Sequence, residues 1–167
     1  TDNRGNLIYY VTYSDTWYGD EDKDDGGWSL EKIDPLTFCS EATNWSASVD
    51  VAGGTPGLIN SVYAENIDDT EPELINLKVM SSNHLMLEFS KNISFSSALE
   101  ISNYSVSNSI GEPNFIMFAD TSYTTILLYF ENQFTHELEN SITISNIYDD
   151  CGNEMETTSS NFIYYLI

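Results

Sequence analysis

Short segments in which apolar and polar residues alternate make up the chain from residue 74 onward. Alternation with a period of two is the pattern of a β-strand that buries one face. Turns rich in Gly, Asn and Ser separate these segments at intervals of about 8–15 residues, which is typical of a β-sandwich. No segment of useful length has the period of an amphipathic helix. The predicted strands are 74–80, 84–89, 104–106, 115–118, 123–130, 142–147 and 161–166.

The beginning of the chain contains three further segments of strand type, 7–13, 28–33 and 44–51. Gly26 and Gly27 can supply the positive φ values of a hairpin turn, and Pro35, which has no N–H, ends the second segment. Residues 64–72 (AENIDDTEP) are acidic and include Pro72, which favours an extended linker. The predicted organisation is a first domain over 1–63, a linker over 64–72 and a second domain over 73–167.

The first domain carries the ordered blocks GGWSLEKIDP, NWSAS and GGTPGLINS. Over residues 5–62 these blocks resemble the C-terminal half of a bacterial lamin-tail domain, which is an immunoglobulin-like β-sandwich. The matching residues are Tyr13, Gly27, Ser29, Leu30, Glu31, Asn44, Trp45, Thr55, Pro56, Gly57 and Asn60. The first half of that family is missing from the match. The resemblance therefore implies an incomplete sandwich, whose segments 7–13 and 28–33 pack on the second domain or pair with another chain.

Residues 72–167 resemble the bacterial immunoglobulin-like domains of surface proteins. The matching pieces are LMLEFSKNIS, NYSVS, TILLYF and ITISNIYDDCGNEM, the last with Asp149, Gly152 and Asn153. Together the two resemblances imply an all-β chain of two immunoglobulin-like modules in tandem, the first incomplete. They imply a non-catalytic structural, adhesive or spacer module of an exported bacterial protein at the cell surface, on the periplasmic side or extracellular. The alternative is an accessory, carbohydrate-binding region of a secreted hydrolase.

The charge of the chain restricts its partners. There are 27 acidic residues against five basic ones, which gives a formal net charge of −22. Phosphate backbones and anionic membranes repel such a surface, so nucleic acid is not an expected partner. No apolar run approaches the ~20 residues that span a bilayer, so membrane insertion is not expected either. The expected partners are therefore a protein or a glycan at the cell surface, or a second copy that contacts the incomplete first domain.

Catalytic motifs do not emerge from the sequence. His84 and His136 are the only histidines, and neither lies in a nucleophile or metal motif. No glycine loop that could hold a phosphate is found, and carboxylate pairs are too numerous to indicate glycoside hydrolysis. We therefore expect no enzyme activity and no cofactor other than weakly bound Ca²⁺.

Two acidic clusters raise the question of calcium. In the first loop Asp20, Asp22 and Asp24 alternate, but Asp25 stands where an EF-hand requires glycine and no helices flank the loop. The second cluster surrounds the linker, and a cation there would rigidify the junction. Its candidate ligands are Asp68, Asp69, Glu71, Asp149 and Asp150. The alternative is a flexible linker whose charges repel one another.

Three aromatic residues are candidates for ligand contact. Trp17 and Tyr18 lie in a polar loop that follows Tyr13, and exposed aromatic rings are the usual platform for sugars. Trp28 and Trp45 fit the core of a sandwich instead.

The two cysteines, Cys39 and Cys151, fall one in each predicted domain and have no metal-ligand spacing. In an exported protein they could form a disulfide, and two free thiols are the alternative.

Overall fold

The computed structural model describes residues 11, 13–37 and 42–166. Its contacts divide the chain into two compact units, Thr1–Asp68 and Asp69–Ile167, called unit 1 and unit 2 below. This boundary falls within the acidic segment 64–72. Over the described ranges the fold is all-β: three antiparallel sheets account for the strands, and the one α-helix has four residues.

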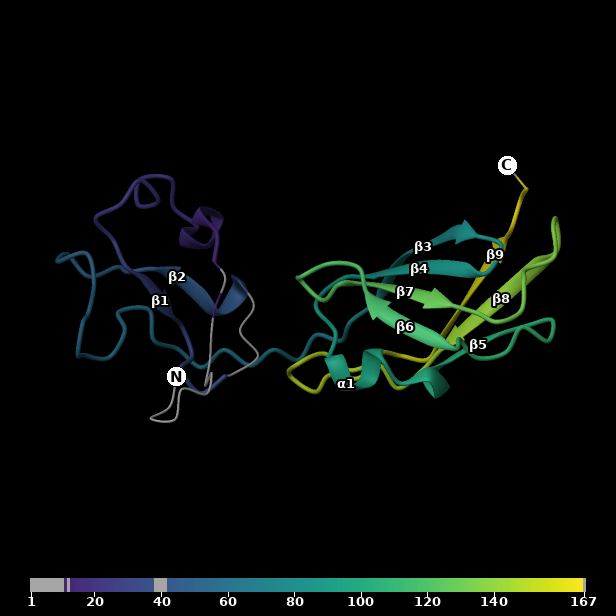
Figure 1. Ribbon diagram of the computed structural model, residues 1–167. Coiled ribbons are helices and arrows are strands. Elements are labelled where there is room, and N and C mark those ends of the chain that lie inside the picture. The colour runs from purple at the N-terminus through teal and green to yellow at the C-terminus, as the bar shows by residue number, and fades with distance from the viewer. Residues whose placement is uncertain (1–10, 12, 38–41, 167) are drawn as a thin grey trace, which may run out of the picture. The chain divides into compact units, whose positions relative to one another are not determined.

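Unit 1 contains a two-stranded antiparallel sheet (Figure 1). Strands β1 (Leu30–Lys32) and β2 (Trp45–Ala47) pair so that Lys32 lies opposite Trp45. Two 3₁₀ turns, η1 (Asp15–Tyr18) and η2 (Ala42–Asn44), precede them respectively. Both strands are shorter than the predicted segments 28–33 and 44–51. β2 ends before a tight turn in which Asp50 accepts from the N–H groups of Ala52 and Gly53. The predicted strand 7–13 lies outside the described residues except for positions 11 and 13, which are not in a strand.

Unit 2 contains two antiparallel sheets (Figure 1). The four-stranded sheet has the order β3–β4–β7–β6, with bounds Leu74–Ser81, His84–Phe89, Thr125–Tyr129 and Phe115–Phe118. The three-stranded sheet has the order β5–β8–β9, with bounds Tyr104–Val106, Glu139–Ile144 and Thr158–Ile163. A short helix α1 (Phe95–Ala98) and a 3₁₀ turn η3 (Ile101–Asn103) connect β4 to β5.

Most strands of unit 2 lie where the alternation predicts them, but the last two begin three residues earlier. β8 includes the polar residues Glu139, Asn140 and Ser141, which pair with Ile163, Phe162 and Asn161 of β9. Asn140 is buried, and its amide is satisfied because it donates to the Leu138 carbonyl and accepts from Asn108. Cross-strand pairing and these local bonds override the polar composition.

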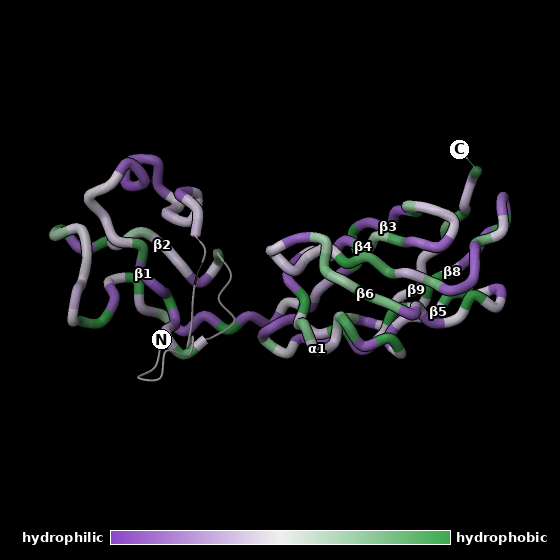
Figure 2. The backbone as a smooth tube through the Cα atoms, in the orientation of Figure 1, coloured by the Kyte–Doolittle hydropathy of each residue, from purple (hydrophilic) through white to green (hydrophobic). Residues whose placement is uncertain are grey.

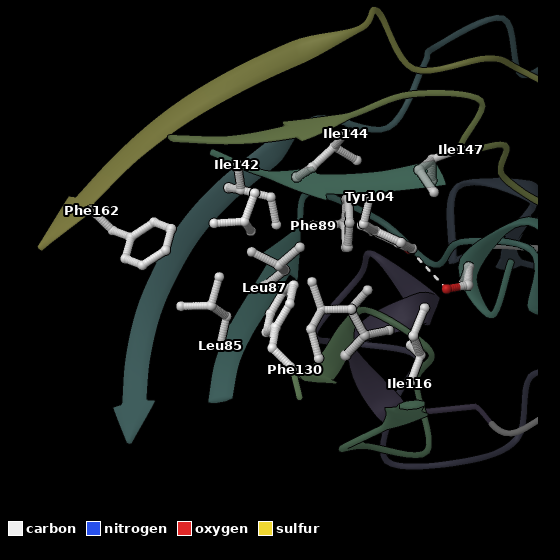
Figure 3. Packing of buried hydrophobic residues seen from close by; sticks show 14 of the residues in the cluster. Leu85, Leu87, Phe89, Tyr104, Ile116, Phe130, Ile142, Ile144, Ile147 and Phe162 are labelled. Atoms are coloured by element: carbon white, nitrogen blue, oxygen red, sulfur yellow. Dashed lines mark hydrogen bonds between the residues drawn. The ribbon is translucent and has the colours of Figure 1, made fainter. Parts of the chain in front are cut away.

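The hydrophobic core of unit 2 lies between its two sheets (Figure 3). Alternate residues of β4 and β7 point inward, and they meet inward residues of β5, β8 and β9. Fully buried members include Leu85, Leu87, Ile126, Leu128, Tyr104, Ile142 and Ile144. The Tyr104 hydroxyl donates to the Ala98 carbonyl at 2.8 Å, so the deepest polar group is paired (Figure 3). Unit 2 is therefore a β-sandwich.

Unit 1 has no comparable core in its described part. Ala47 is the only buried hydrophobic side chain there. Val51, Leu58 and Ile59 are 99%, 77% and 76% exposed. Unit 1 is instead held by polar contacts, which centre on Glu31.

Candidate functional site

Glu31 is the centre of a hydrogen-bond network in unit 1. The alternation of β1 turns its side chain away from Leu30 and Lys32, and it is only 5% exposed. One carboxylate oxygen accepts from the Ser29 hydroxyl at 3.2 Å and from the Thr55 N–H and hydroxyl at 2.9 and 2.6 Å. The other accepts from the Ser61 N–H and hydroxyl, each at 2.7 Å. Glu31 therefore ties the loop after β2 to β1.

These donors determine the protonation state of Glu31. Burial by itself would raise the pKa of the carboxyl, but the hydrogen bonds from Thr55, Ser61 and Ser29 outweigh it and lower the pKa from its ordinary value of 4.5 to about 2. The group is thus ionised at neutral pH with its acceptor positions occupied. A carboxylate in this state has a structural role and is a poor general base or metal ligand.

The other residues of the GGWSLE–NW–TPG–N pattern close the same network. Asn44 is buried and bonds the backbone of Asp34 through both ends of its amide. The Asn60 amide donates to the Lys32 carbonyl at 2.8 Å. Gly53 accepts from the Ser29 N–H, and a Cβ at Gly53 would collide with the backbone oxygen of Gly27. The spaced motif in the sequence therefore encodes polar contacts between segments that are distant in the chain.

An open groove of about 460 Å³ lies beside this network. It is lined by Ser29, Leu30, Glu31, Lys32, Trp45, Gly54, Thr55, Pro56 and Asn60. The Trp45 indole N–H is buried, and it is the only buried side-chain polar atom without a hydrogen-bond partner in the described part of the chain. A groove with an aromatic wall and several polar side chains fits a small ligand in type, although this one is open.

The three candidate aromatic residues differ in their surroundings. Trp17 is half-buried, with its ring centroid 6.4 Å from that of Trp45. The Tyr18 hydroxyl donates to the Trp28 carbonyl at 3.3 Å, whereas Tyr13 is 61% exposed. Ser14 caps the η1 turn that carries Trp17 and Tyr18. Their role in ligand binding stays a prediction, and Trp28 and Trp45 are half-buried rather than fully enclosed.

The acidic loop 19–27 is organised around its own lysine. Lys23 donates to the Ser48 carbonyl at 3.1 Å, lies 3.4 Å from the Asp20 carboxylate, and stands 4.7 Å from the centre of the Trp28 ring. Asp20 also accepts from the Asp22 N–H. Gly26 and Gly27 have the expected positive φ, 109° and 86°. Lys23 thus holds the loop next to the end of β2, and weak cation binding by its aspartates stays a prediction.

Asp149 is the corresponding polar centre of unit 2. Its side chain is 1% exposed and lies 2.8 Å from the Lys91 ammonium. It also accepts from the N–H groups of Cys151 and Asn153 and from the Asn153 amide. Burial would raise the pKa of Asp149, but Lys91 and Asn153 hold it below its usual range. This part of the chain is therefore a loop closed by its own hydrogen bonds to Asp149, whose charge is paired with Lys91.

The other predicted cation ligands are more exposed. Asp150 and Asp69 are exposed and Glu71 is half-buried, while Asp68 is the last residue of unit 1. The Asp150 carboxylate accepts from the Asn92 amide at 3.0 Å. A cation site formed by Asp68, Asp69, Glu71, Asp149 and Asp150 stays a prediction.

Cys151 is disulfide-bonded, and Cys39 lies outside the described residues, so the predicted pairing of the two also stays a prediction.

Both histidines contact aromatic rings. His84 begins β4, as expected, and packs edge-on against Tyr129 at 4.1 Å. His136 is exposed, 3.8 Å from the Glu137 carboxylate and 6.1 Å from the Tyr165 ring.

Within the described residues, no helix is long and apolar enough to cross a membrane.

Comparison with known proteins gives a likeness in fold alone. No family model matches the chain, and neither does any curated protein. Among solved structures, the chain is similar to surface layer protein SbsC, domains 1–6, with a TM-score of 0.52 and 18% identity over 57% of this chain and 14% of that one. A structure of the N-terminal part of the bacterial S-layer protein SbsC gives a TM-score of 0.52 and 17% identity over 57% and 24% of the two chains. The match spans a minor part of those proteins, and at this identity it shows a common fold.

Proposed function

We propose that this chain is a non-catalytic structural module of an exported bacterial surface protein, acting as a spacer or an adhesive element. The observation that carries the proposal is the all-β fold of the chain, 57% of which is similar in fold to part of a bacterial S-layer protein. The described carboxylates with lowered pKa support it, because Glu31, Asp34, Asp120 and Asp149 are all occupied by hydrogen-bond donors of the chain itself. None is left available as a catalytic acid or base.

Location at the cell surface can be tested on the source bacterium. Protease treatment of intact cells should remove the protein from an immunoblot while a cytoplasmic marker stays intact. Protection of the protein until the cells are lysed would contradict export to the surface.

Unit 1 supports a role in association. Its described part buries only Ala47 among hydrophobic residues, whereas Val51, Leu58 and Ile59 are exposed. A half-sandwich of the lamin-tail type would cover such side chains with a partner protein or a second copy. If this is right, Leu58→Ser and Ile59→Ser together should remove the contact made by unit 1 and so weaken the self-association of the native chain in sedimentation. Unchanged association would locate the contact elsewhere.

Carbohydrate binding is the second candidate, because the groove beside β1 and β2 has Trp45 in its wall and Trp17 packed on that ring. A glycan panel should then give a positive response that Trp17→Ala or Trp45→Phe removes. Trp28→Phe is a matched control, because Trp28 does not line the groove. A panel without any response would exclude this role and leave the spacer.

A further inference from the structure

The four edge strands of unit 2 are not equally protected. β3 carries Lys78 and two register irregularities, at 74/76 and 79/81. β5 has three residues, and β9 opens with the polar run 158–161. These are the devices that keep sheet edges from pairing with other chains. β6 (Phe115–Phe118, FIMF) is also short, with four residues, but it has no charge and no irregularity, and among the described strands it pairs only with β7.

The outer face of the sheet beside β6 is apolar as well. The strand register places Lys78, Met86, Leu127 and Met117 in one row across β3, β4, β7 and β6. A second row contains His84, Tyr129 and Phe115, whose rings contact one another in sequence. Phe115 is 54% exposed and Met117 41%. Hydrophobic residues continue along the whole of β6 in Figure 2.

This face also differs from the rest of the chain in charge. Its outward positions on β3, β4, β7 and β6 include one basic residue, Lys78, and one acidic residue, Glu88. The chain as a whole has a net charge of −22. Two copies that meet at the β6 edge of this sheet therefore bring few like charges of its strands together.

We propose that two copies of the chain pair antiparallel through β6 about a two-fold axis, which joins their four-stranded sheets into one. The proposal does not depend on where the protein is located in the cell. It follows that the row ending at Met117 would continue into the second copy as Met117, Leu127, Met86 and Lys78. Such an isologous contact closes on itself and leaves no β6 edge exposed.

Charge selects the register of this pairing. Residues directly opposite must lie on the same face, so a two-fold axis passes through a residue of β6. Only an axis at Ile116 or Met117 opposes more than one residue of this four-residue strand. An axis at Ile116 would place Glu112 opposite Asp120 of the other copy, and like charges opposite each other are destabilising. An axis at Met117 places Asn114 opposite Asp120 and Glu112 opposite Ser122. We therefore assign the axis to Met117.

Cysteine crosslinking tests both the contact and its register. Opposed Cα atoms in an antiparallel pair lie about 4.5–5.5 Å apart, within the range of a disulfide. Met117→Cys should therefore give a covalent dimer on mild oxidation of the full chain. Phe115→Cys is the matched control on the same strand and face, because its two copies would be offset by four residues, about 13 Å along the strand. Equal crosslinking of both variants, or none by Met117→Cys, would overturn the assignment.

Sedimentation equilibrium tests the contact without a new thiol. Because salt screens the repulsion between two acidic chains, dimerisation of the native chain should strengthen on going from low salt to about 0.5 M. Met117→Lys opposes two ammonium groups at the axis and should leave a monomer, whereas Met117→Leu should retain the dimer. Melting curves verify that both variants fold. In a chain that already carries Leu58→Ser and Ile59→Ser, absence of dimerisation in high salt, or a Met117→Lys dimer, would contradict pairing through β6.

Discussion

At the scale of single residues, unit 1 is stabilised by polar side chains rather than by apolar ones. Glu31 accepts five hydrogen bonds from Ser29, Thr55 and Ser61, which joins β1 to the loop after β2. Asp149 and Lys91 play the equivalent role in unit 2. A buried charge is stable only while its partners remain, so both sites should be sensitive to the loss of one member.

We expect Glu31→Gln to destabilise unit 1 by about 3 kcal/mol, because an amide NH₂ would face donors that need an acceptor. All three tryptophans, Trp17, Trp28 and Trp45, lie in unit 1, so their fluorescence in a urea titration reports this unit alone. Glu21→Gln is the control, since Glu21 is exposed in the acidic loop. A midpoint equal to that of the native chain would refute the structural role of Glu31.

The lowered pKa of Glu31 also predicts an acid response. Its ionised form contributes stability that is fully present above pH 4.5 and is lost as the pH falls through about 2. Hydrogen bonds from the N–H groups of Leu36 and Asn66 lower the pKa of Asp34 as well, so part of the response should remain in Glu31→Gln. Tryptophan fluorescence across this interval should show a shallower loss of stability in the variant. An equal dependence of stability on pH in the native chain and in Glu31→Gln would contradict the role of Glu31 in the acid response.

Removing Lys91 should leave Asp149 buried without its counter-charge. Lys91→Met is expected to lower the stability of unit 2 by about 3–5 kcal/mol. Lys78→Met is the matched control, because Lys78 is exposed on β3. Calorimetry would measure the change, and equal melting temperatures for the two variants would argue against a supporting role for the ion pair.

At the scale of elements, the loop after β2 depends on close backbone approach. Gly53 has a φ of 84°, and a Cβ there would meet the Gly27 carbonyl oxygen. Gly57 also has a positive φ, 77°, but has open space around it. Comparing an alanine substitution at each glycine therefore distinguishes the cost of a left-handed backbone from the cost of a steric collision.

We expect Gly57→Ala to cost about 1–2 kcal/mol, the strain of a left-handed backbone. Gly53→Ala should cost clearly more, because it adds a collision with backbone to a similar strain. The urea midpoint from tryptophan fluorescence measures both. Comparable losses of stability in the two variants would show that the backbone can relax where Gly53 approaches the Gly27 carbonyl oxygen.

At the scale of the whole molecule, the two units have different sources of stability. Unit 2 has a closed apolar core between two sheets, whereas the described part of unit 1 buries one hydrophobic side chain. Apolar burial supplies most of the favourable free energy of folding. Unit 1 should therefore unfold at a lower temperature than unit 2.

Parallel melting experiments would test this difference. Tryptophan fluorescence follows unit 1, and far-UV circular dichroism is dominated by the strands of unit 2. The fluorescence transition should come first. Coincident transitions would mean that the two units unfold as one cooperative body.

The alternating pattern of the sequence determined the strands of unit 2, because inward residues such as Leu85, Leu87, Ile126 and Leu128 can be identified from a period of two. The resemblance of the first domain to a lamin-tail domain pointed to the spaced motif around Glu31. What the sequence could not show is which atoms meet: the five donors on Glu31 come from positions up to 30 residues away. The absence of protection on the β6 edge depends likewise on which strands become neighbours, and only the tertiary fold decides that order, because pairing partners are chosen by long-range contacts.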